Sequence, residues 1–318
     1  MRKKVIIDCD PGIDDAVALT MALFDPRLQV LAVTACGGNV PADQASCNLQ
    51  SLVQLLDPAR LPKIGVASKD IVLPSSPFSL HGNDGLGGLN LPQTNLHGAR
   101  SAEKVICETL REYPHEVTII ALGPLSNVSR AFSRDPSLID LVDSIIMSGG
   151  TLYGHGNATP VADVNFFCDP HAAQHVVHEH ISTTLVPLET SRQMVFGFDV
   201  LDQLPPVSSR AGRILHRMLP HYFRAHRQLL GSEGIVMHDV VALVAATNPE
   251  LFDRERATAD VEIAGNLTTG MLVLDRRHNT NVRGNVDMLV DCDSTAVGDC
   301  VLRGLALAGS QTESDYSN

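Results

Sequence analysis

The chain has 318 residues, 44% of them hydrophobic, and a formal net charge of −12. A chain of this size can bury a large core as one α/β domain or as two smaller ones. Its negative charge argues against a nucleic-acid partner, because proteins that bind the phosphate backbone usually present concentrated Lys and Arg. There is no run of about 18 apolar residues to suggest a membrane span, and too few apolar residues precede Asp8 to form a secretory signal. We therefore expect a cytoplasmic protein with a small-molecule ligand and no membrane partner.

Four aspartates follow a short apolar strand near the N-terminus. Asp8 and Asp10 lie on one face of that strand, because side chains alternate with period two. A Pro-Gly turn comes next, and Asp14 and Asp15 then open a helical pattern over residues 16–24. Two like charges about 4 Å apart repel by roughly 4 kcal/mol at an effective dielectric near 20, so the cluster is unfavourable unless it is protonated, solvated or metal-bound. An all-oxygen set suits a hard cation, Ca²⁺ or Mg²⁺.

Two other interpretations of the aspartates need no enzyme. In the first, Asp14 caps the helix and Asp15 is an acid favoured by the helix dipole, but capping explains at most two of the four acids. The second is an EF-hand loop, which requires Gly at its sixth position and Glu at its twelfth. Counted from Asp8, those positions hold Ile13 and Leu19. Both interpretations therefore explain the run less well than a metal site.

A third alternative is an aspartyl phosphotransferase. That pattern places Asp-x-Asp-x-Thr/Val after an apolar strand, with Asp8 as the nucleophile and Asp10 as the acid and base. Here Gly12 stands where the pattern has Thr or Val, which weakens the match.

Strand and helix patterns then alternate along the chain. Strands are predicted at residues 5–7, 30–34, 64–66, 117–122, 144–147 and 183–187. Helical patterns lie between them, at 16–24, 42–56, 102–113, 125–133 and 170–178. This alternation predicts an α/β fold with a mostly parallel central sheet that is flanked by helices. Ligands bind beyond the carboxyl ends of strands in such sheets, and five residues lie at or just past these ends: Asp10, Asn39, Leu122, Gly149 and Glu189.

The alternation is interrupted twice and changes near the C-terminus. Residues 67–100 are rich in Pro, Gly, Ser and Asn, and residues 191–237 contain a helical pattern at 208–230, so both segments are predicted to form lids. A helix at 240–246 and a small antiparallel addition follow, with strands at 261–263, 271–274 and 286–290 and a closing helix at 294–308. We expect a single catalytic domain over residues 1–309 and a polar, disordered tail over 310–318.

Several short motifs resemble one known family in the same order along the chain. The first is the aspartate-rich turn, Asp8-Cys9-Asp10-Pro11-Gly12-Ile13-Asp14-Asp15-Ala16. The later ones are Gly37-Gly38-Asn39, His81-Gly82-Asn83-Asp84-Gly85-Leu86, Gly123-Pro124-Leu125-Ser126-Asn127, Met147-Ser148-Gly149-Gly150, Gly156-Asn157-Ala158-Thr159-Pro160, Asn165, Asp169-Pro170 and His238-Asp239. Together they resemble the inosine-uridine-preferring nucleoside hydrolases over residues 3–308. The resemblance implies that family's fold and the hydrolysis of ribonucleosides to ribose and a free base.

The same resemblance implies a calcium site. Its ligands would be the carboxylates of Asp10, Asp15 and Asp239 and the backbone carbonyl of Leu122. By this resemblance Asp10 is also the general base that activates water, and Asp14 holds a ribose hydroxyl. Asp8 is expected either to orient the neighbouring acids or to position the water without contacting the metal.

Further residues match positions that line the substrate pocket in the family. Asn39, Met147, Asn157 and Asn165 are expected around the ribose, and an asparagine suits hydroxyl groups because it both donates and accepts. The family usually has Glu followed by an aromatic residue where this chain has Asp163 and Val164. The shorter Asp163 is the expected partner of the ribose 5′-hydroxyl, with a weakened contact.

The base side of the pocket is assigned to histidines. His238 matches a proton donor to the leaving base, His81 matches a second base contact, and His226 lies in the predicted lid. The chain has no Trp, four Tyr and nine Phe, which disfavours an aromatic clamp around a purine. We therefore expect pyrimidine or broad ribonucleoside specificity, and the shorter Asp163 and altered lid leave a modified or non-standard nucleoside as an alternative. The open alternatives are the Mg²⁺-dependent phosphotransferase and a non-catalytic nucleoside or ribose binder, and the resemblance implies a homodimer or homotetramer.

Overall fold

The computed structural model describes residues 2–68, 80–92, 96, 98–277 and 284–313. A nine-stranded sheet runs through the molecule in the order β3-β2-β1-β4-β5-β6-β9-β7-β8. The pairs from β3 to β9 are parallel, whereas β7 pairs antiparallel with both β9 and β8. The strands are β1 (Lys3–Cys9), β2 (Leu28–Ala35), β3 (Lys63–Gly65), β4 (Val117–Ala121), β5 (Val142–Ser148), β6 (Thr183–Val186), β7 (Phe252–Val261), β8 (Leu272–Asp275) and β9 (Val286–Cys292).

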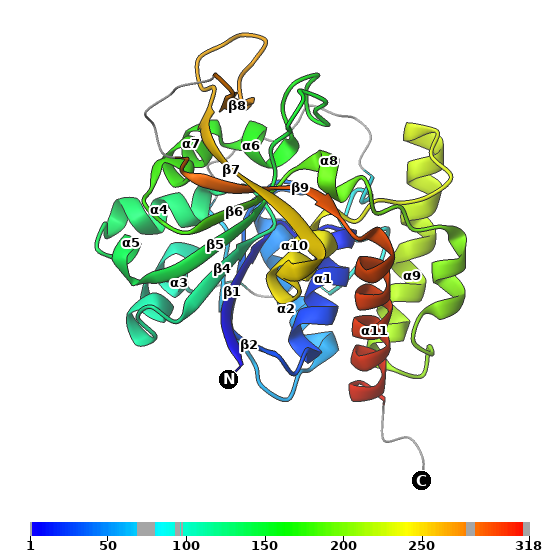
Figure 1. Cartoon of the computed structure of the whole chain (residues 1–318). Coiled ribbons are helices and arrows are strands. Elements are labelled where there is room, and N and C mark those ends of the chain that lie inside the picture. The colour runs from blue at the N-terminus through cyan, green and yellow to red at the C-terminus, as the bar shows by residue number, and fades with distance from the viewer. Residues whose placement is uncertain (1, 69–79, 93–95, 97, 278–283, 314–318) are drawn as a thin grey trace.

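Helices cover both faces of this sheet (Figure 1). One side carries α1 (Ile13–Phe24), α2 (Ala42–Leu56), α9 (Arg210–Ala225), α10 (His238–Thr247) and α11 (Ser294–Gln311). The other side carries α3 (Ala102–Glu112), α4 (Ser126–Arg134), α5 (Leu138–Leu141) and α7 (Pro170–His178). Shorter helices are α6 (Val164–Cys168), α8 (Leu188–Ser191), η1 (Phe198–Gln203), η2 (His226–Leu230) and η3 (Pro249–Leu251). The predicted α/β fold with a mostly parallel sheet is thus confirmed.

Strand β1 shows why its sequence is apolar throughout. Val5 and Ile7 belong to the core on the α1 side, and Ile6 belongs to the core on the α4 side. A strand that is covered on both faces must be apolar at successive positions, since each side chain enters one core or the other. The chain then leaves the sheet through Pro11 and Gly12 and enters α1. This turn brings the acids of the strand end close to those of the first helical turn.

The structure corrects several predicted elements. Strand β7 begins at Phe252, well before the predicted start at 261, because its exposed charged residues hide the strand pattern in the sequence. The helix predicted over 208–230 is divided into α9 and the π-helical turn η2. The predicted lid at 67–100 lies partly outside the described residues, and its described part contains no helix or strand of three or more residues.

The C-terminal boundary was also placed too early. Helix α11 continues to Gln311, and Thr312 is fully buried, with its carbonyl accepting a hydrogen bond from the Arg210 amide at 3.0 Å. The predicted domain end at residue 309 therefore falls inside a packed helix. Residues 314–318 of the predicted tail lie outside the described residues. Among the described helices, none has the length and apolar character needed to cross a membrane.

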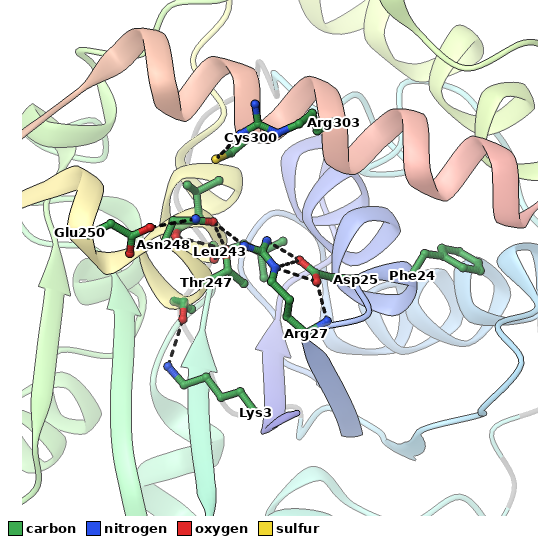
Figure 2. Close-up of polar contacts among 12 residues, drawn as sticks. Lys3, Phe24, Asp25, Arg27, Leu243, Thr247, Asn248, Glu250, Cys300 and Arg303 are labelled. Carbon is green, nitrogen blue, oxygen red and sulfur yellow. Dashed lines mark hydrogen bonds and ion pairs between the residues drawn. The ribbon is translucent and has the colours of Figure 1, made fainter. Parts of the chain in front are cut away.

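The C-terminal ends of α1 and α10 lie side by side (Figure 2). The Arg27 guanidinium pairs with the Asp25 carboxylate at 2.6 Å and donates to Asn248 Oδ1 at 2.9 Å. Lys3 donates to the Ala246 carbonyl at 3.0 Å. Positive side chains are favourable at helix C-termini because the helix dipole is negative there. These contacts connect two helices whose opposite ends carry acidic residues.

Candidate active site

Five aspartates gather where strand and helix ends meet. Asp8 lies near the end of β1 and Asp10 follows that strand, Asp14 and Asp15 lie in the first turn of α1, and Asp239 lies in the first turn of α10. All five are at most 5% exposed. Carboxylate oxygens of Asp14, Asp15 and Asp239 lie within 4.8 Å of one another, and the described part of the chain holds no other group of three or more such ligands this close.

Asp15 has one oxygen that is satisfied and one that is not. Its Oδ2 accepts from the Gly12 amide at 2.8 Å and from Asn39 Nδ2 at 3.3 Å. Its Oδ1 is buried and has no hydrogen-bond partner among the described residues. A buried, unpaired carboxylate oxygen is unfavourable, so it indicates a missing positive partner. The cluster therefore fits a hard divalent cation.

Asp10 lies beside this cluster in a space that two glycines keep open. Its Oδ2 accepts from the Asn39 amide at 2.7 Å, and Asn39 Nδ2 donates to its backbone carbonyl at 3.1 Å. A Cβ atom at Gly38 would lie 2.0 Å from Asp10 Oδ2, and one at Gly123 would lie 2.5 Å from Oδ1. Neither position can carry a side chain unless the Asp10 carboxylate moves.

We expect Gly38→Ala to lower turnover by about 10²-fold, because displacing a reacting group by about 1 Å can have that effect. The comparison is Gly298→Ala in α11, where the new Cβ meets only the flexible end of Met194 at 3.2 Å. Turnover and thermal unfolding should be measured for both variants. A Gly38→Ala protein that is folded and fully active would contradict the tight fit around Asp10.

Burial dominates the electrostatics of the acids. Loss of solvation raises the pKa of Asp8 to about 7 and the pKa values of Asp14 and Asp15 to about 6. Burial, and after it neighbouring carboxylates, raises the pKa of Asp10 and of Asp239 well above the usual range. Each shift has the sign expected when charge is removed from water and placed near like charge. In the metal-free protein, burial and mutual repulsion therefore favour the protonated forms of these acids, and a bound cation would favour the ionised forms.

Asp8 lies behind the cluster, not in it. Its Oδ1 accepts from Thr34 Oγ1 at 2.5 Å and from Asn127 Nδ2 at 2.8 Å. Its backbone carbonyl accepts from the Leu122 amide at 2.8 Å. The sequence analysis did not predict the contacts of Asp8 with Thr34 and Asn127. Thr34 belongs to the neighbouring strand β2 and Asn127 to α4, and both elements were expected from the alternation of strand and helix patterns.

Three further predicted pocket residues lie in different surroundings. Asn165 lies near the site: its Nδ2 donates to the carbonyl of Leu122 at 2.7 Å and to that of Ser148 at 2.9 Å. Met147 is fully buried in the core on the α4 side. Asn157 is exposed, and its Oδ1 accepts from the Val164 amide at 2.9 Å.

Asp163 has a structural role that the sequence did not reveal. Its carboxylate accepts from three backbone amides, Gly150 at 2.7 Å, Asn165 at 2.9 Å and Phe166 at 3.3 Å. It is 1% exposed, and burial raises its pKa to about 6. The residue caps α6 and holds the loop after β5. Three hydrogen bonds to the carboxylate oxygens of Asp163 therefore come from the protein itself.

Aromatic rings gather beside the acids. His81 Nδ1 accepts from the Ile13 amide at 3.0 Å and lies 3.7 Å from an Asp14 oxygen. The ring of Tyr222 lies 5.3 Å from that of His81 and 4.3 Å from that of His226. Burial lowers the pKa of His81 to about 4, so this ring is neutral at pH 7. The sequence singled out both histidines but not Tyr222, which α9 places between them.

His238 stands at the first residue of α10, next to Asp239. Its Nδ1 lies 2.6 Å from Ser191 Oγ, and burial lowers the pKa of the ring to about 3. The positive charge of Arg192 and the rings of His226 and His81 lower it further. The structure thus brings the three histidines and the acid cluster together at one edge of the sheet.

This fold and this site define an α/β enzyme with a buried acidic centre suited to a metal ion. The family model described as inosine-uridine preferring nucleoside hydrolase matches residues 5–299, and the chain belongs to that family. The resemblance drawn from its motifs is thereby confirmed.

Relatives are similar in sequence along nearly the whole chain. The inosine-uridine preferring nucleoside hydrolase of Leishmania major is 31% identical over 299 residues, which is 92% of this chain and 95% of the relative. The non-specific ribonucleoside hydrolase RihC of Escherichia coli is 32% identical over 310 residues, covering 97% and 100%. The solved plant nucleoside hydrolase PpNRh1 superposes with a TM-score of 0.87 at 29% identity, covering 96% and 99%. The protein is a hydrolase of ribonucleoside N-glycosyl bonds, and neither the phosphotransferase nor the non-catalytic binder is supported.

Proposed function

We propose that the protein is a Ca²⁺-dependent ribonucleoside hydrolase that accepts pyrimidine nucleosides or a broad range of bases. The observation that carries the metal proposal is the buried cluster of Asp14, Asp15 and Asp239, in which Asp15 Oδ1 has no partner among the described residues. The range of bases is supported by two relatives, the non-specific RihC and the pyrimidine-specific RihA of Klebsiella pneumoniae, which is 31% identical over 313 residues. The absence of Trp from the chain agrees with it.

The proposed ligands are the carboxylates of Asp10, Asp15 and Asp239 and the carbonyl of Leu122. The three carboxylates whose oxygens lie within 4.8 Å of one another are those of Asp14, Asp15 and Asp239, so Asp14 either joins the proposed ligands or holds a ribose hydroxyl beside them. The Leu122 carbonyl already accepts from Asn165, and its second lone pair is available. A divalent cation bound there would orient the ribose hydroxyls and lower the pKa of a water molecule.

The chain's own residues then account for three requirements of glycoside cleavage. Asp10, which the Asn39 amide and the two glycines hold in place, accepts the proton of the attacking water. The concentrated negative charge of the cluster stabilises the positive ribosyl centre that develops as the bond breaks. His81 and His238 lie on the adjoining side, where they can donate hydrogen bonds to the departing base.

Metal binding is expected to release protons. The pKa values of Asp14 and Asp15, about 6, are raised in the metal-free protein, so the acids bind protons below that pH and a cation above it. Calcium affinity should be highest above pH 7 and fall roughly tenfold per pH unit for each proton displaced as the pH drops below 6. Titration calorimetry in buffers of different ionisation enthalpy measures the released protons directly. An affinity that stays constant between pH 5 and 8 would refute this linkage.

One assay tests the function against its alternatives. The calcium-loaded protein is incubated with a panel of ribonucleosides and nucleotides, and ribose, free base and phosphate are measured. Ribose and base without phosphate is the expected result, with uridine or cytidine among the substrates. Phosphate release would support the phosphotransferase, and tight binding without turnover would support the binder. Repeating the assay with Mg²⁺ in place of Ca²⁺ tests the choice of ion.

The domain, assembly and location remain predictions. One catalytic domain should resist limited proteolysis as a single fragment, and a homodimer or homotetramer should appear in sedimentation analysis. A location in the cytoplasm is proposed from the sequence.

A further inference from the structure

Ser191 makes a short contact with the base-side histidine. It is the last residue of α8, is 1% exposed, and places its Oγ 2.6 Å from His238 Nδ1. The two residues come from different elements, since His238 opens α10. Among the described residues, no other hydrogen bond reaches the His238 ring. The orientation of the ring in its plane therefore depends on one hydroxyl group.

That hydroxyl has one hydrogen and three acceptors within reach. The acceptors are His238 Nδ1 at 2.6 Å, the Leu188 carbonyl at 3.1 Å and the Pro187 carbonyl at 3.3 Å. The 2.6 Å contact can form with either atom as the donor. The ring nitrogen is the nearest of the three acceptors, and we assign the hydroxyl hydrogen to it because hydroxyl hydrogen bonds are most favourable near 2.7 to 2.8 Å and weaken with distance. A neutral imidazole that accepts at Nδ1 carries its hydrogen on Nε2.

The opposite arrangement would disable the base side. If Ser191 turned its hydrogen to Leu188, His238 would have to donate from Nδ1 to keep the contact. Its Nε2 would then present only a lone pair. A departing base gains electron density on its oxygen and nitrogen atoms, so it needs a donor there and is repelled by a lone pair.

We propose that Ser191 is a positioning residue that keeps Nδ1 of His238 as an acceptor and thereby presents Nε2–H to the leaving base. This inference rests on the proposed function, in which His238 faces that base. The neighbouring Thr190 provides a matched control: it is fully buried on the same helix, but its hydroxyl donates to the Leu289 carbonyl at 2.6 Å, away from His238.

The test compares two substrates. Uridine needs help for its leaving base, whereas p-nitrophenyl riboside has a leaving group that departs without a proton. Ser191→Ala should lower kcat on uridine by about tenfold and change kcat on p-nitrophenyl riboside by less than about twofold, since one positioned hydrogen bond typically has this effect. Ser191→Thr should restore uridine turnover because it keeps the hydroxyl. Thr190→Val should leave the ratio of the two rates unchanged.

A double-mutant cycle separates this role from a structural one. If Ser191 acts through His238, adding Ser191→Ala to His238→Ala should cause no further loss on uridine. Equal losses on both substrates, failure of Ser191→Thr to restore the rate, or additive losses in the cycle would each overturn the inference. Failure of the proposed function is distinguishable, because the unmodified protein would then release ribose from neither substrate.

Discussion

Asp10→Ala is expected to abolish ribonucleoside hydrolysis, with a loss of about 10⁴-fold or more. General base catalysis alone typically contributes 10²- to 10⁴-fold, and Asp10 is proposed both as that base and as a metal ligand. The loss should appear in kcat with uridine, measured as released ribose at saturating calcium. Restoring activity by raising calcium would assign Asp10 to metal binding alone.

Asp239→Ala provides the paired measurement. It removes an anionic ligand from the group of Asp14, Asp15 and Asp239, so calcium affinity should fall sharply. Asp140→Ala, at an exposed position in α5, is a control that should leave both affinity and rate unchanged. If Asp10→Ala and Asp239→Ala both keep the calcium affinity and the rate of the unmodified protein, the proposed ligand set is wrong.

The proximity of the N-terminal acids was predictable because these residues are close in sequence and short-range structure brings them together. A buried strand, a Pro-Gly turn and a helix start bring Asp10 and Asp15 together without help from distant parts of the chain. Asp239 became part of the prediction only through the family resemblance, since no local pattern connects residue 239 to residue 15. The position of Asp239 beside Asp15 depends on the packing of α10 against α1, which is a tertiary contact that a local sequence pattern does not show.

The contacts that the sequence did not reveal are of the same tertiary kind. Asp163 is predicted at a ribose hydroxyl, and the sequence did not reveal that its carboxylate also accepts from three backbone amides around the loop after β5. Strand β7 was missed at its start because exposed charged residues such as Arg254 and Glu255 read as a loop, although the strand pairs with β9 there. The role proposed for Ser191 depends on its contact with His238, which lies 47 positions later in the sequence. No local pattern could have predicted that contact.

His238 is the residue on which the base-side chemistry depends. Burial lowers its pKa to about 3, so the ring is neutral between pH 5 and 8, and the hydrogen it can offer is the one on Nε2. A hydrogen bond from this neutral group stabilises a departing pyrimidine at O2 or N3, where negative charge develops. Because the ring does not titrate in this range, it should add no inflection to the pH profile of kcat between pH 5 and 8.

His238→Ala should therefore lower turnover of uridine by 10²- to 10⁴-fold, the usual range for a positioned acid, while largely sparing p-nitrophenyl riboside. Because the neutral ring donates a hydrogen bond and transfers no proton, the loss should lie near the lower end of that range. Calcium affinity should be measured in parallel, because His238 precedes the proposed ligand Asp239 and its removal can disturb the start of α10. Equal losses on both substrates with weakened calcium binding would assign His238 to the placement of Asp239 and leave His81, whose ring adjoins Asp14 and Tyr222, as the residue to test next on the base side.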